Sequence, residues 1–64
     1  MIKKGTVTSK SNGKCRVLIE DLNYETGLLT IATHINYETL NIDDTVVVAF
    51  FNSQQTRGAV IAKI

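Results

Sequence analysis

Apolar and polar side chains alternate in several short stretches of the chain. The clearest is 14–20, where Cys15, Val17 and Ile19 alternate with residues that point the other way. Such alternation is typical of a strand with one face in a core, because successive side chains project to opposite faces. Other stretches rich in β-branched and apolar residues occupy 2–10, 28–34, 45–51 and 58–64. The pattern therefore predicts five strands.

Turn-forming residues separate the predicted strands. Asn12-Gly13 follows the first strand, and this pair favours a two-residue hairpin because both turn positions need a positive φ. Polar connections follow at 21–27, 36–44 and 52–57. The connection at 36–44 is the longest, and it offers Leu40 and Ile42 to close one end of a barrel.

The order of strands and turns predicts the fold class. Short strands without a convincing helix, with turns about every 8 to 12 residues, are typical of a small β-barrel. Ile2 and Val7 would face opposite sides of a regular strand, so we expect a bulge near Gly5 to bend the first strand. The bent strand and the long connection favour a single domain over 1–64, an all-β, five-stranded OB-like Greek-key barrel. An SH3-like barrel is the alternative.

Length and composition narrow the function classes. A chain of 64 residues forms one small domain, which is marginally stable without disulfides, metals or partners. Its single cysteine excludes a disulfide framework, and one cysteine with one histidine does not fill a tetrahedral metal shell. We therefore expect support from a protein partner or from copies of the same chain.

The distribution of charge and hydropathy bears on location and partners. The apolar runs are too short for a membrane span, and no apolar segment of a secretory signal follows the first lysines. We therefore expect cytoplasmic synthesis and no membrane contact. Five of the seven basic residues lie in the first 16 positions, and all six acidic residues lie between positions 20 and 44. This separation suits docking of unlike faces better than wrapping nucleic acid.

The residues that could support catalysis have simpler structural interpretations. Alternation points Cys15 into the core, and His34 ends a strand beside a polar loop, where a surface position is the default. Asp43 and Asp44 are adjacent, so their side chains diverge in an extended segment and a role in a turn is expected. We expect no enzyme activity, no cofactor and no metal site.

The fourth and fifth predicted strands carry apolar side chains on both faces. Their inward residues are Val46, Val48 and Phe50, followed by Val60, Ala62 and Ile64. Four large apolar side chains then face outward: Leu18, Val47, Phe51 and Ile61. A large exposed apolar patch is rare on a monomer and marks a protein contact. Two alternatives stay open: the connection at 36–42 covers the patch, or a bulge turns one phenylalanine inward.

Nucleic-acid binding is the alternative function. The first hairpin carries Lys10, Lys14 and Arg16, which we expect on its outer face, where they would contact phosphates. The second and third predicted strands present no aromatic side chain outward on which a base could stack. Protein docking is therefore the preferred interpretation, and an inhibitor-like protein that binds a host factor is a third class.

The segment LNYET at 22–26 recurs nearly unchanged as INYET at 35–39. Two copies at this spacing match no known solenoid period, so a repeat architecture is rejected. Two similar loops with partly buried tyrosines, or chance, explain the recurrence.

Several short motifs follow one another in a familiar order. The first half holds GTV at 5–7, GKCRV at 13–17 with ED at 20–21, and LLTI at 28–31. The second half holds IDDTVVVAFF at 42–51 and RGAVI at 57–61. In this order they resemble the small OB-fold domains of tailed-phage baseplate hubs and spikes, and of related contractile injection machines.

The resemblance implies a structural module that docks into a symmetric tail or baseplate assembly, as a homo-oligomer and a component of the virion. It also implies that Asp44 and Gly58 define the fold and have no catalytic role. Asp43 stands where the family has glycine, so the tight turn into the fourth strand is the place where this chain departs from the family pattern. The trimeric β-helix and tip of the spikes have no counterpart here, so membrane piercing is not implied.

Overall fold

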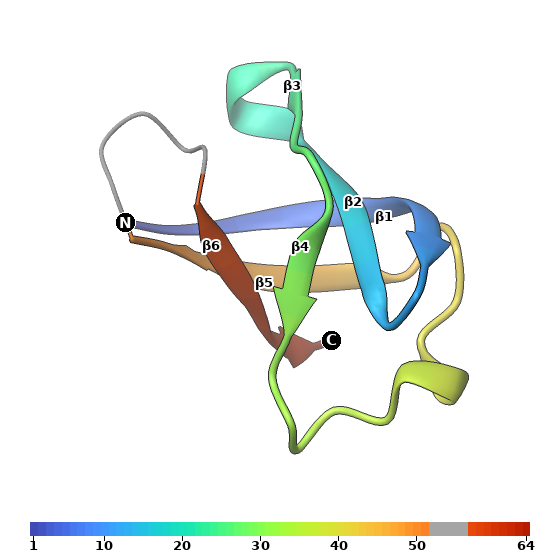
Figure 1. The fold of residues 1–64 in the computed structure, drawn as a ribbon. Helices are drawn as coiled ribbons and strands as arrows, with labels where there is room; N and C mark the ends of the chain where they lie inside the picture. Colours follow the sequence, from blue (N-terminus) through green and yellow to red (C-terminus); the bar gives the residue numbers. More distant parts are fainter. Residues whose placement is uncertain (52–56) are drawn as a thin grey trace.

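The computed structural model describes residues 1–51 and 57–64 (Figure 1). In these ranges the strands are β1 (Ile2–Ser11), β2 (Lys14–Ile19), β3 (Tyr24–Glu25), β4 (Leu29–Ile31), β5 (Thr45–Phe50) and β6 (Gly58–Lys63). Two 3₁₀ turns, η1 (Glu20–Leu22) and η2 (Tyr37–Thr39), lie in the connections. The described ranges contain no α-helix. The polar turn predicted at 52–57 lies almost entirely outside them.

The strands close into an OB-like Greek-key barrel, as predicted. The barrel strands pair in the order β1–β5–β6–β4–β2, and β2 pairs back with β1. All of these pairs are antiparallel except β4–β6, which is parallel. β3 is an additional two-residue strand on β2. The mixed Greek-key topology confirms the all-β barrel and excludes the SH3-like alternative.

Gly5 lies where β1 is shared by its two neighbours. It pairs with Ile19 in β2 and with Val46 in β5. A Cβ atom at this position would lie 2.5 Å from Val17 Cγ1 and 2.6 Å from the carbonyl oxygen of Leu18. The missing side chain therefore lets β2 cross β1 closely enough to close the barrel.

The bulge in β1 lies later in the strand than the sequence predicts. The register between β1 and β2 shifts between Val7 and Ser9, which leaves Thr8 as the additional residue. Gly5 is itself buried, so it shares the inner face with Val7 by ordinary alternation and needs no bulge. The bulge expected near Gly5 would bring Ile2 and Val7 to one face, and this expectation is wrong: Ile2 is 59% exposed, whereas Val7 is buried.

Two turns use the conformations that their residues favour. Asn12 and Gly13 have φ angles of 52° and 78°, which is the hairpin turn predicted for Asn-Gly. Asp43 has a φ of 76°, a left-handed conformation that aspartate tolerates better than most residues. The tight turn before β5 therefore forms with an aspartate at position 43.

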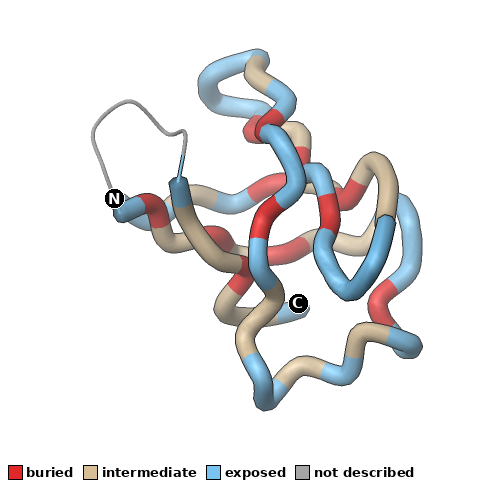
Figure 2. Tube along the Cα trace, in the orientation of Figure 1, coloured by how far each residue is buried: buried red, intermediate tan, exposed pale blue. Residues whose placement is uncertain are grey.

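The core fills the inside of the barrel (Figure 2). Its buried residues are Val7, Cys15, Val17, Ile19, Leu29, Leu40, Val46, Val48, Phe50 and Val60. Leu40, from the long connection, is fully buried and closes one end of the barrel as predicted, whereas Ile42 is 55% exposed and does not. The third predicted strand is shorter than expected, because the chain leaves the sheet after Ile31.

A register shift in β6 changes which of its residues face inward. Val48 pairs with Val60, but Val47 pairs with Ala62, so Ile61 is the additional residue between them. Val60 is buried as predicted. The shift places Ala62 opposite the outward Val47, and Ile64 is 72% exposed, so the predicted inward positions of Ala62 and Ile64 are wrong.

Candidate interaction surface

The outward residues of β1, β5 and β6 form one apolar surface. Pairing aligns Ile2, Ala49 and Ala59 in one row across the three strands, and the next row holds Val47 and Ala62 beside Lys4. Phe51 follows β5 directly and Ile61 lies at the register shift. We call this surface the outer apolar face: Ile2, Val47, Ala49, Phe51, Ala59, Ile61 and Ala62.

The outer apolar face contains three of the four predicted contact residues. Phe51 is 72% exposed, whereas Val47 and Ile61 are half-buried. Leu18 lies apart from them: it is in β2, opposite Thr6, and strand β1 separates β2 from β5. The sequence therefore predicts the surface on β5 and β6 but assigns Leu18 to it wrongly.

The connection between β4 and β5 passes one edge of this face. His34 Nε2 lies 2.9 Å from the carbonyl oxygen of Ile61, and Lys63 Nζ donates to the carbonyl oxygen of Thr39 over 2.9 Å. Phe51, directly after β5, is 72% exposed. The connection at 36–42 therefore does not cover it. Phe50 is the inward phenylalanine, and no bulge in β5 turns Phe51 inward.

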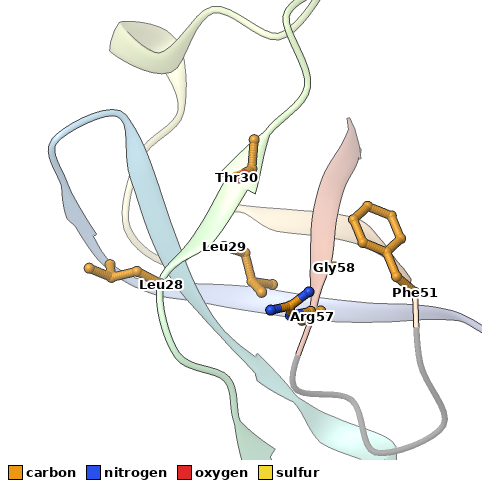
Figure 3. A pocket seen from close by; sticks show the side chains of 6 residues that line it. All are labelled: Leu28, Leu29, Thr30, Phe51, Arg57 and Gly58. Carbon is orange, nitrogen blue, oxygen red and sulfur yellow. The ribbon is translucent and has the colours of Figure 1, made fainter.

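A hollow of about 290 Å³ opens between β4 and the start of β6 (Figure 3). Its lining residues are Leu28, Leu29, Thr30, Phe51, Arg57 and Gly58. Leu28 and Phe51 stand at its two sides, and the guanidinium of Arg57 lies between them (Figure 3). The hollow adjoins the outer apolar face at Phe51 and adds a cation to it.

Two of the three predicted basic-patch residues lie next to this hollow. Lys14 pairs with Thr30 across β2 and β4, and Arg16 follows on the same outer face of β2. Lys10 is not with them, because the bulge at Thr8 reverses the direction of the side chains after it. The expectation that all three share the outer face of the hairpin is therefore wrong for Lys10.

Lys10 instead closes the barrel end beside Leu40. It pairs with the buried Cys15, and its Nζ donates to the carbonyl oxygens of Leu40 and, over 3.0 Å, of Tyr37. The same ammonium lies 4.4 Å from the centre of the Tyr37 ring, a favourable cation–π distance. These contacts join the first hairpin to the long connection.

Replacing Lys10 by methionine is expected to lower the free energy of unfolding by about 1 to 3 kcal/mol, because hydrogen bonds from a charged donor to two carbonyls are lost. Lys14→Met is the matched control: Lys14 is exposed at the hairpin end and should change stability by less than about 0.5 kcal/mol. Urea unfolding followed by circular dichroism measures both. Equal stability of the two variants would show that the Lys10 contacts do not stabilise the fold.

Cys15 and Asp44 have pKa values that are shifted by their surroundings in the fold. Burial raises the pKa of the Cys15 thiol, and the nearby charge of Lys10 opposes this shift only in part, so the neutral thiol is an inert part of the core. The backbone N–H of Asn41, and after it the ammonium of Lys63, lower the pKa of Asp44. Both contacts hold the turn before β5.

Within 1–51 and 57–64, no three histidine, cysteine or acidic side chains gather in a way that could hold a metal ion. No helix in the same ranges has the length and hydropathy needed to cross a bilayer.

The chain matches no protein-family model and no curated protein sequence. The barrel, its outer apolar face and the basic hollow beside it are therefore the features from which a function can be inferred.

Proposed function

We propose that this chain is a non-enzymatic structural module that assembles through its outer apolar face, first of all with further copies of itself. The observation that supports the proposal is the exposure of large apolar side chains beside β5: Phe51 is 72% exposed and Ile2 is 59% exposed. Outward positions of a solvated strand are normally polar. Here Ala49 pairs with Ile2, and Val47, two residues earlier in β5, continues the same apolar surface on the side away from Phe51.

The size of the chain supports the same proposal. A standard protein interface buries about 800 Å² on each partner, which is about a fifth of the 3967 Å² surface of this chain. A domain of 64 residues has little core, so burial of its outward apolar residues against a partner adds stability that the isolated barrel lacks. A net charge of only +1 also keeps repulsion between copies small.

A tail or baseplate assembly of a phage or prophage is the setting that we propose for this module. Such assemblies repeat one contact between copies about a symmetry axis, which a single apolar face on a small domain provides. Two features support the likeness to baseplate OB-fold domains: the OB-like barrel, and the turn before β5, which forms with Asp43 in a left-handed conformation.

The substitution Phe51→Asp tests the proposal. It places a charge on the most exposed large side chain of the contact while leaving the core intact, so we expect a folded monomer of 7.1 kDa where the wild type is larger. Leu22→Asp is the matched control, because Leu22 is also exposed but lies on η1, away from the outer apolar face. Size-exclusion chromatography with light scattering gives the masses. If Phe51→Asp keeps the wild-type mass, the face is not the contact.

A further inference from the structure

We infer that the hollow beside Phe51 is a second binding site, which takes single-stranded nucleic acid. The site is the hollow itself together with Lys14, which pairs with the lining residue Thr30, and Arg16, two residues farther along the outer face of β2. The outer apolar face lies on β1, β5 and β6 and is uncharged, whereas this site includes residues of β4 and the basic side chains of β2. The two surfaces share Phe51.

The charges around the hollow favour an anion. Arg57 is part of its lining, and Lys14 pairs with the lining residue Thr30. The acidic residues lie in η1, β3, η2 and the turn before β5, and none of them lines the hollow. Thr8 Oγ1 donates to Glu25 Oε2 over 2.6 Å and also lies 3.3 Å from the carbonyl oxygen of Arg16, so this carboxylate lies near Arg16 and outside the lining of the hollow. A phosphate in the hollow therefore meets Arg57 and no carboxylate among the lining residues.

The side chains at the hollow also suit a flat aromatic group. The ring of Phe51 is 72% exposed, and the guanidinium of Arg57 lies between it and Leu28 (Figure 3). Thr30 pairs with Ala59, so small side chains lie between these larger ones and let a planar group approach the sheet. Bases stack on phenylalanine rings and on guanidinium planes without regard to sequence.

An aromatic platform next to cations matches the chemistry of a nucleotide, which joins a base to a phosphate. An acidic peptide would satisfy the cations but would leave the Phe51 ring without a stacking partner. We therefore expect a single strand to lie across β4, with a base on Phe51 and Arg57 and with phosphates at Lys14 and Arg16. Because assembly and nucleic acid both require Phe51, binding is measured at protein dilutions at which the chain is monomeric.

The test is fluorescence anisotropy with a labelled oligothymidylate of about 12 nucleotides, a length within the range that one OB-type barrel covers. Phe51→Ala and Arg57→Ala should each weaken binding, the first by about 5- to 150-fold if one base stacks on the ring. Lys14→Ala combined with Arg16→Ala should flatten the slope of log affinity against log salt concentration by about 1.4, as expected for two lost phosphate contacts on a single strand.

The double variant Lys3→Ala/Lys4→Ala is the matched control, because it removes the same charge from β1, away from the hollow. It should keep the wild-type affinity and salt slope. The inference is overturned if the wild type does not bind in dilute salt, or if this control weakens binding as much as Lys14→Ala/Arg16→Ala. It is also overturned if polyglutamate competes equally well and Phe51→Ala binds like the wild type, since the hollow would then be an acidic-peptide site.

Val47→Asp separates this inference from the proposed function. Val47 lies on the outer apolar face and does not line the hollow, so the variant should lose self-association and keep oligonucleotide binding. Loss of both properties in a folded variant would show that the two surfaces are one site, and the inference of a second site would fail.

Discussion

Gly5→Ala is expected to remove a large part of the stability of the fold. The new Cβ would lie 2.5 Å from Val17 Cγ1 and 2.6 Å from the carbonyl oxygen of Leu18, and the second of these is a backbone atom. That carbonyl cannot move away while Gly5 pairs with Ile19 in β2. Overpacking of this kind costs about 3 kcal/mol or more, against a total stability of about 3 to 10 kcal/mol for 64 residues.

Gly27→Ala is the control for this variant, because a Cβ at Gly27 meets no atom within 4 Å. It should match the wild type or be slightly more stable, since alanine restricts the unfolded chain more than glycine does. Thermal unfolding followed by circular dichroism distinguishes the two. A melting temperature of Gly5→Ala within a few degrees of that of Gly27→Ala would mean that β1 and β2 do not cross as closely as described.

Leu40→Ala has the second largest expected effect. Leu40 is fully buried although it belongs to the connection between β4 and β5 and not to a strand. Removing its side chain leaves a cavity at the barrel end, and such truncations cost about 2 to 5 kcal/mol. The backbone of the same residue accepts a hydrogen bond from Lys10, so the loss also loosens the link between the connection and the first hairpin.

Ile42→Ala is the natural comparison, two residues farther along the same connection. Its side chain is 55% exposed, so truncation should cost less than about 1 kcal/mol. Urea titrations of both variants give the difference in the free energy of unfolding. Equal costs would show that Leu40 does not close the barrel.

Alternation predicted the barrel strands well, because each strand has one side in the core. The inward positions of Cys15 and Phe50 and the turn at Asn12-Gly13 follow from local pattern alone. The two register shifts could not be located in this way. Bulges at Thr8 and Ile61 depend on how β1 and β6 meet their neighbours, and each reverses the direction of the side chains that follow.

The two similar pentapeptides illustrate the same limit. Tyr24, in the first copy, lies in strand β3, whereas Tyr37, in the second, begins the 3₁₀ turn η2. Thr26 is buried, and its Oγ1 accepts a hydrogen bond from the N–H of Val17, but Thr39 is exposed. The same local sequence takes two conformations, because different neighbours pair with it.

The sequence also predicted only part of the two candidate surfaces. The outward position of Phe51 follows from alternation in β5, and the exposure of this residue agrees with it. The neighbouring Arg57 and the hollow between them and Leu28 were missed, because the parallel pairing of β4 with β6 joins segments far apart in the sequence. The sequence did carry one signal for this site: the charged residues at these positions, Lys14, Arg16 and Arg57, are all basic.

Sedimentation equilibrium of the wild-type chain over a wide range of concentrations tests the central claim most directly. If the outer apolar face joins copies of the chain, the average mass should rise above the 7.1 kDa of one chain and converge on a whole multiple of it. A mass of 7.1 kDa at every concentration would contradict assembly through this face.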